Sequence, residues 1–307
     1  MTQQSQTANI IEKLWPRLLK LKRMRQKIII QNAAGIIIFL LVLSKILPDD
    51  LWQSFPQYWE KGSIQFYFIV ALGLGFGLGY LQYYTYMRDF CSFVNDIVRE
   101  MWAIIHPDLQ YLPEEYVPQE LFVDSNLFSE SIARYEGKDL VVGKLTPGDA
   151  QKALGSTDTT EIKLSIIHAK KSAGFSSEGS EHFTTIFYGL FFVAEFKKRL
   201  RGDISLNRSV PWYQALFQNE VEFRDPEFEK KLIVSPLMKK IVELTQKNGR
   251  KSRISFNNQR VYVGISPGGI QTSTCLLHDG VLEQYLADIE LLFALVADLN
   301  SNRHIWC

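Results

Sequence analysis

Cysteine is scarce in this chain of 307 residues, which contains only Cys91, Cys275 and Cys307. The number is odd and the sequence has no Cys-x-x-Cys pair, so it indicates reduced thiols rather than a disulfide framework. The five histidines include no pair at the i, i+4 spacing of a helical zinc site. Cys275 and His278 are three residues apart, but no second pair accompanies them. We therefore expect no metal and no cofactor.

Motifs of the common catalytic and nucleotide-binding classes are also missing. The sequence has no Gly-x-Ser-x-Gly elbow, no protein-kinase motifs and no P-loop. Beyond residue 81 it holds 25 Lys and Arg against 29 Asp and Glu, a mildly acidic balance. Because nucleic-acid-binding domains are typically basic, nucleic acid is not an expected partner. No residue is assigned a catalytic role.

Charge is absent from residues 64–81, IQFYFIVALGLGFGLGYL. A helix of about 20 apolar residues crosses the hydrocarbon core of a bilayer, which is ~30 Å thick. The alternative is a glycine-rich phosphate loop. A dinucleotide fingerprint needs a glycine at its sixth position, and that position is Leu78 or Tyr80 in the two registers available here. The run therefore predicts a membrane span near residues 64–84.

Four glycines alternate within this run: Gly73, Gly75, Gly77 and Gly79. Gly73 and Gly77 are four positions apart, and so are Gly75 and Gly79. This is the spacing that lets helix backbones approach closely in lipid. We expect them to pack against the other span or a second copy of the chain. The alternative is that they have no packing role, because membrane helices tolerate glycine in any case.

A second apolar run, residues 28–47, precedes the first in the chain. It is followed by SKILPDD rather than by a small-residue cleavage site, which favours an uncleaved anchor over a signal peptide. Residues 1–27 hold seven basic residues against one acid, whereas the connector 48–63 holds three acids against one base. Since Lys and Arg concentrate on the cytoplasmic side, we expect both termini and the large domain in the cytoplasm.

The N-terminal segment, residues 1–27, is basic and amphipathic. Its apolar residues recur at three- and four-residue steps: Ile10, Ile11, Leu14, Trp15, Leu18 and Leu21. The cations largely lie between and after them: Arg17, Lys20, Lys22, Arg23, Arg25 and Lys27. This pattern predicts a helix on an anionic membrane surface. The alternative is that the cations only fix the topology of the spans.

Residues 88–307 are predicted to form one cytosolic domain after a two-helix anchor over residues 28–87. Apolar residues keep a helical period up to residue 105, and then the period changes. Strands are expected at 161–171, at 182–196 as a strand buried on both faces, and at 253–265 as two strands around Asn257-Asn258. Helices are expected at 235–249 and 281–299. Without regular βαβ alternation, the fold class is α+β, with a mixed or antiparallel sheet and flanking helices.

Five pieces of the sequence follow one another in a recognisable order: YLPEEYVPQELFVDSNLF, RYEGKDLVVGKL, IKLSIIHAKK, IFYGLFFVAEFKKRLRG and VEFRDPEFEKKL. With Tyr135, Gly137, Asp139, Gly143 and the run 187–192, they resemble a bacterial family of two-span membrane proteins catalogued as domain of unknown function 3137. The resemblance covers most of residues 65–307. It implies location in the bacterial cytoplasmic (inner) membrane and brings no activity or cofactor. Family members usually have a longer segment where this chain has only residues 232–235, so a shared site there would be lost.

Three functions are compatible with these features. The leading hypothesis is a non-enzymatic, membrane-anchored binding or scaffold module, whose partner is a protein, the membrane surface or a second copy. An enzyme acting on a membrane-associated substrate is the alternative, with a site near His168 or the acids of residues 222–229. An oligomeric pore or transporter subunit is less favoured, because ion pathways need polar side chains. A deep polar pocket holding carboxylates or histidines with shifted pKa values would favour the enzyme, whereas a flat or apolar exposed patch would favour binding.

Overall fold

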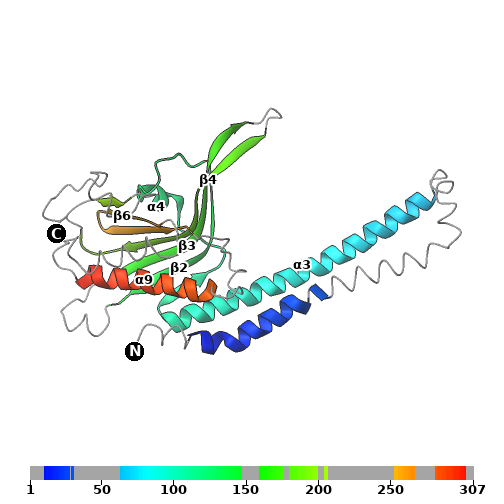
Figure 1. Ribbon diagram of the computed structural model, residues 1–307, viewed down its shortest axis with the longest axis horizontal. Coiled ribbons are helices and arrows are strands. Elements are labelled where there is room, and N and C mark those ends of the chain that lie inside the picture. Colours follow the sequence, from blue (N-terminus) through cyan, green and yellow to red (C-terminus); the bar gives the residue numbers. More distant parts are fainter. Residues whose placement is uncertain are drawn as a thin grey trace. The chain divides into compact units, whose positions relative to one another are not determined.

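The computed structural model describes residues 10–27, 29–30, 63–146, 159–175, 180–199, 204–206, 252–266 and 281–301 (Figure 1). The chain divides into two compact units. One unit is Ile11–Ile97, and the other is Val98–Cys307 with Met1–Ile10. The second unit contains the β-sheet.

In the residues that the structure describes, the sheet has seven strands, all antiparallel to their neighbours, in the order β1-β2-β3-β4-β7-β6-β5. The strands are β1 (Leu109–Leu112), β2 (Arg134–Leu145), β3 (Thr160–Phe175), β4 (Glu181–Glu195), β5 (Ile204–Leu206), β6 (Ser252–Asn257) and β7 (Arg260–Ile265). The described helices of this unit are the end of α3 (Ser63–Ile105), α4 (Gln119–Asp124) and α9 (Val281–Ser301). The α+β class with an antiparallel sheet and flanking helices is thus confirmed.

Strand β4 is central, as its apolar sequence predicts, but only its second half is buried. From Leu190 onward it pairs with β7 on one side, and β3 pairs with it on the other. Its first residues, 181–185, are exposed. Strand β2 pairs with β3 only as far as Lys170. Beyond that residue β3 and the start of β4 pair with each other alone, as a hairpin that projects from the sheet (Figure 1). The prediction of a strand buried on both faces was therefore wrong for the first third of β4.

One face of the sheet is covered by α9. This helix confirms the one predicted at 281–299. Its apolar side chains from Leu282 to Leu299 are buried because they recur on the side that faces the strands. Thr160 of β3 is fully buried on this face, and Asn300 of α9 donates a hydrogen bond of 2.8 Å to its hydroxyl. The last turns of α3 also belong here, since the Trp102 ring lies edge-on to the Tyr285 ring at 6.3 Å.

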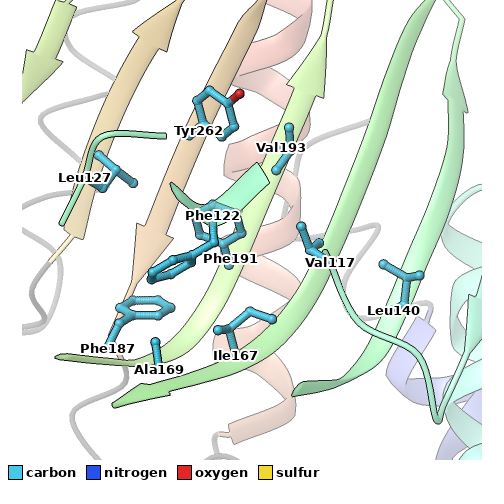
Figure 2. Close-up of a cluster of buried hydrophobic side chains, with 10 residues drawn as sticks. All are labelled: Val117, Phe122, Leu127, Leu140, Ile167, Ala169, Phe187, Phe191, Val193 and Tyr262. Carbon is cyan, nitrogen blue, oxygen red and sulfur yellow. The ribbon is translucent and has the colours of Figure 1, made fainter. Parts of the chain in front are cut away.

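The opposite face is covered by residues 113–133, which include the short helix α4. Figure 2 shows the cluster of buried side chains on this face, with Phe122 of α4 placed over Phe191 of β4. The centroids of these two rings are 5.0 Å apart. The backbone N–H of Val117 donates to the Ser165 hydroxyl over 3.0 Å, which ties the covering segment to β3. The proline-containing stretch 106–118, which follows the end of α3, thus contains β1 and leads into a packed layer.

The N-terminal unit is built from two helices that run antiparallel. Residues 10–27 and 29–30 are helical. α3 is one helix of 43 residues, which confirms that the helix of the run 64–81 continues along the helical period up to residue 105. The Tyr86 hydroxyl donates to the Met24 carbonyl oxygen over 2.7 Å. The Lys20 ammonium lies 4.9 Å from the centre of the Phe93 ring. From Lys20 to Met24 the first helix advances along the chain, whereas its contacts on α3 go back from Phe93 to Tyr86, so the two helices are antiparallel.

The described part of the chain contains no helix whose length and apolar character would suffice for a membrane crossing. The first predicted span, residues 28–47, lies almost wholly outside the described residues. For the second, the backbone of α3 is described, whereas the side chains of residues 63–79 are not. The surroundings of Gly73, Gly75, Gly77 and Gly79 are therefore outside the description, and both spans stay predictions. Outside it too lie the predicted helix at 235–249, the acids of 222–229, the 232–235 connection and Cys275 with His278.

Candidate binding site at the β6–β7 turn

A polar hollow of about 410 Å³ opens where β4 and β6 end and β7 begins. Strands β6 and β7 contribute both sides of their hairpin turn, β4 contributes its last residue, and α4 contributes its last residue from the covering layer. The lining residues are Asp124, Glu195, Arg199, Asn257, Asn258, Gln259, Arg260 and Tyr262. All of them belong to the sheet unit.

Arg260 is held between two carboxylates in this hollow. It lies directly opposite Glu195 in the β4–β7 register. Its Nε donates to Glu195 Oε2 over 3.0 Å and its Nη2 to Glu195 Oε1 over 3.4 Å, the two-point geometry typical of arginine and carboxylate. Asp124 Oδ2 lies 3.8 Å from Arg260 Nη1. The hydrogen bond to Glu195 is the main cause that raises the pKa of Arg260, so this cation is fixed in charge and position.

The turn that forms one wall is tied to its surroundings. Asn257 and Arg260 are paired, so the two turn residues are Asn258 and Gln259, one position later than the predicted Asn257-Asn258. Asn258 has a φ of 56°, a left-handed conformation that asparagine tolerates better than most residues. The Asn257 side chain donates to the Asp124 carbonyl oxygen over 3.1 Å, and the Phe196 N–H donates to the Gln259 carbonyl oxygen over 2.8 Å. The wall is therefore connected to both α4 and β4.

The hollow presents donors and acceptors side by side. The Arg260 guanidinium supplies donors, and the carboxylates of Asp124 and Glu195 keep lone pairs that Arg260 does not use. Tyr262 forms part of the floor, and burial is the main cause that raises the pKa of its hydroxyl. The exposed Arg199 adds a cation at the rim. This set suits recognition of a polar group that both donates and accepts hydrogen bonds.

A second polar cluster surrounds Asp139, which lies in a bulge of β2 with a φ of 62°. Asp139 is only 7% exposed, and the Tyr111 hydroxyl donates to its Oδ1 over 2.6 Å. The other carboxyl oxygen, Oδ2, has no hydrogen-bond partner among the described residues. Burial raises the pKa of Asp139, and the Tyr111 hydrogen bond and then Lys138 partly oppose this change. Because the carboxyl lies inside the protein rather than in an open pocket, we assign it a structural role.

His168, the predicted candidate for an enzyme, lies on β3 opposite Tyr188. Its Nε2 is 3.1 Å from the Thr185 hydroxyl, and burial, followed by Lys170, lowers its pKa. Tyr188 is seven residues from Glu195 along β4, about 23 Å at the rise of an extended strand. His168 and the hollow are therefore separate. In the residues that the structure describes, no three His, Cys, Asp or Glu side chains are grouped so as to hold a metal ion.

The basic residues predicted to meet the membrane surface lie on the N-terminal helix. Arg17, Lys20, Lys22, Arg23, Arg25 and Lys27 are all exposed. Two apolar residues of the same helix, Leu14 and Leu21, are buried within the protein. Contact of the cations with lipid stays a prediction.

Sequence reasoning missed the residues of the hollow. Glu195 and Arg260 are 65 positions apart, and their pairing depends on β7 rather than β5 lying next to β4. The local sequence shows only that Glu195 ends an apolar strand and that Arg260 follows an Asn-rich turn. Charged residues in solvent-exposed turns show the same pattern.

The comparisons with known proteins concern the same part of the chain. Residues 185–301 match the family model described as "Protein of unknown function (DUF3137)". The matched range contains Glu195, Arg260 and α9, and it excludes Asp124 and the residues Tyr135 to Gly143 that also suggested the resemblance. No curated protein and no solved structure matches the chain. This match supports, for residues 185–301, the resemblance to a family of proteins of unknown function that the sequence indicated.

Proposed function

We propose that this protein is a membrane-anchored binding module whose sheet domain recognises a protein partner at the hollow around Arg260. The observation that carries the proposal is the bracketing of Arg260 by Glu195 and Asp124 in an open, polar hollow. Charged groups that are already fixed by one another lose little freedom when a ligand arrives, which favours binding. The backbone and polar side chains of a polypeptide supply the donors and acceptors that this site complements.

The anchor is proposed from the two apolar runs, residues 28–47 and 64–81, and from the helix pair that flanks them. Residues 64–81 carry no charge, and α3 is helical through all of them. The antiparallel contacts of Met24 with Tyr86 and of Lys20 with Phe93 bring the start of one run beside the end of the other. This is the arrangement that a helical hairpin in a membrane requires.

The proposed orientation has both termini and the sheet domain in the cytoplasm of a bacterium, with residues 48–63 outside. Its support is the excess of Lys and Arg before residue 28. Reporter fusions at Gln57 and after Cys307 test it. The proposal requires an exported reporter at Gln57 and a cytoplasmic one after Cys307, and the opposite result at either position would contradict it.

The hollow is tested with a photo-crosslinking amino acid in the full-length protein in its own membrane. One variant carries it at Gln259, which lines the hollow, and the control carries it at Glu161, an exposed residue of β3. We expect a discrete adduct, identified by mass spectrometry, from position 259 only. Equal adducts from both positions, or none from position 259, would contradict a binding role for the hollow.

A further inference from the structure

Large apolar side chains are exposed on both helices of the N-terminal unit at one level. They are Ile29 and Ile30 on the first helix and Tyr80, Tyr83 and Tyr84 on α3, with exposed fractions of 61%, 66%, 70%, 47% and 58%. Tyr80 and Tyr84 are one helical turn apart, and their rings stack with centroids 6.5 Å apart. Exposed apolar side chains gathered in this way mark a surface that meets another apolar phase or partner.

The antiparallel register shows that these residues share a level. Both helices rise by the same distance per residue, so equal steps from a contact reach positions side by side. Ile29 is five residues after Met24, and five residues before Tyr86 is position 81. Counting from the contact between Lys20 and Phe93 gives position 84 instead. Ile29 and Ile30 therefore lie beside residues 80 to 84.

Cations lie directly beside this apolar level, on the side away from the uncharged runs. Arg23, Arg25 and Lys27 precede Ile29 within two turns of the helix, and all three are exposed. Arg88 follows Tyr84 by about one turn on α3, where its side chain is 70% exposed and lies 3.7 Å from Asp89. The level thus has a tyrosine-rich apolar side and a side with an excess of positive charge. We call the following set of residues the belt: Arg23, Arg25, Lys27, Ile29, Ile30, Tyr80, Tyr83, Tyr84 and Arg88.

We infer that the belt binds the phosphate headgroups of anionic lipids. The inference rests on the proposed membrane anchor and adds to it a lipid class and the residues that select it. Tyrosine favours the boundary between hydrocarbon and headgroups, and Lys and Arg beside it attract anionic headgroups. On the first helix the order is cations, isoleucines and then the apolar run; on α3, read backward, it is Arg88, the tyrosines and then the apolar run. This is the order of layers at a membrane surface.

The belt also changes which part of the N-terminal helix meets lipid. The sequence pattern alone favours a helix lying flat on the membrane through its apolar stripe. Leu14 and Leu21 of that stripe are 0% and 2% exposed, so these side chains are already packed inside the protein. Trp15 of the stripe is 55% exposed, so the stripe no longer offers a continuous apolar face. We therefore assign contact with lipid to the end of the helix, at Arg25, Lys27 and the isoleucines that follow.

The test is the selection of anionic lipid by the full-length protein. Protein purified in detergent is placed in nanodiscs made of phosphatidylcholine with a minority of phosphatidylglycerol, extracted again, and the retained lipids are quantified by mass spectrometry. We expect phosphatidylglycerol to be enriched several-fold over the mixture supplied. The variant R25Q/K27Q should lose most of the enrichment. The control K13Q/R17Q removes two exposed charges of the same helix, at least six residues before the belt, and should keep the enrichment.

A second variant, R25K/K27R, keeps the charges and should retain the enrichment. Equal losses in R25Q/K27Q and K13Q/R17Q would overturn the inference, because they would indicate diffuse attraction without a belt. Absence of enrichment in the wild type would overturn it as well. Alkaline carbonate extraction of native membranes measures the anchor separately. Protein that resists extraction but selects no lipid refutes only the belt, whereas protein released by carbonate refutes the proposed anchor.

Discussion

Glu195 at the end of β4 and Arg260 at the start of β7 face each other across neighbouring strands, with Arg260 Nε 3.0 Å from Glu195 Oε2. Their side chains are 40% and 33% exposed. Solvent screens a pair of this kind, so its contribution to the free energy of unfolding is less than about 1 kcal/mol. The two-point geometry therefore matters more for the position of the guanidinium than for stability.

The first prediction separates these two roles. Glu195→Gln should change the free energy of unfolding by less than about 1 kcal/mol. The same change should lower partner binding by roughly tenfold, because Gln has one acceptor oxygen and no charge, so the two-point contact that positions Arg260 is lost. Thermal unfolding and the yield of adduct from position 259 measure the two effects.

The control is Glu161→Gln, which breaks the exposed pair with Lys144 elsewhere in the sheet and should affect neither. Unchanged adduct yield in Glu195→Gln would contradict the role given to the pair.

The second prediction concerns Gly143 of β2, where the chain passes close to the segment before β1. A Cβ atom at this position would lie 2.5 Å from the Asp108 carbonyl oxygen, a backbone atom that cannot move aside alone. Gly143→Ala should therefore destabilise the sheet domain by about 1–3 kcal/mol, as overpacking does in other cores. The resulting fall in melting temperature is roughly 2–4 °C per kcal/mol for a domain of this size.

Gly264 of β7 supplies the matched control for that substitution. A Cβ there would lie 3.3 Å from the edge of the Phe187 ring, a side chain that can shift slightly. Gly264→Ala should lower the melting temperature less than Gly143→Ala does. The reverse order would mean that the close approach at Asp108 is not a constraint on the fold.

The contrast between β4 and β2 shows what the sequence can predict. The second half of β4 is apolar at successive positions, and this composition indicates a buried central strand wherever its neighbours lie. Strand β2 contains two glycines and the bulged Asp139, so no period of two stands out, although it pairs with β3 along nearly its whole length. The hollow is a similar case, because Glu195 and Arg260 meet only after β7 has bypassed β5 in the sheet order. Such long-range register leaves no local pattern.

The third prediction is the effect of pH on the contribution of Asp139. Burial raises its pKa in the folded protein above the unfolded value of about 3.9, so the folded state favours the protonated carboxyl. The stability that this proton confers is fully present below about pH 4 and is lost as the pH rises through the folded-state pKa. Asp139→Asn carries no titrating proton, tolerates the left-handed backbone and can still accept the Tyr111 hydrogen bond.

We therefore expect Asp139→Asn to melt at a higher temperature than the wild type at pH 7–8. The difference should shrink as the pH falls toward 4, and each unit of pKa shift corresponds to about 1.4 kcal/mol. Melting curves in detergent across this range measure the difference between the two proteins, which removes the titration of other groups. A difference that does not vary with pH would show that the buried carboxyl binds no extra proton in the folded state.

The last prediction concerns the glycines of the second predicted span. In lipid the acyl chains are as apolar as the side chains, so helices associate through close van der Waals contact and hydrogen bonds rather than through a hydrophobic driving force. If Gly73, Gly75, Gly77 and Gly79 allow such an approach, Gly77→Leu should separate the helices by steric bulk. Insertion should be kept, because leucine is more apolar than glycine.

Cysteine pairs placed between the two spans, and between the second spans of two copies, should crosslink in the wild type and several-fold less in Gly77→Leu. Because the contacts of Tyr86 and Lys20 lie outside the span, a control pair at the level of Met24 should crosslink equally in both proteins. Equal crosslinking within the span as well would assign the glycines no part in helix packing.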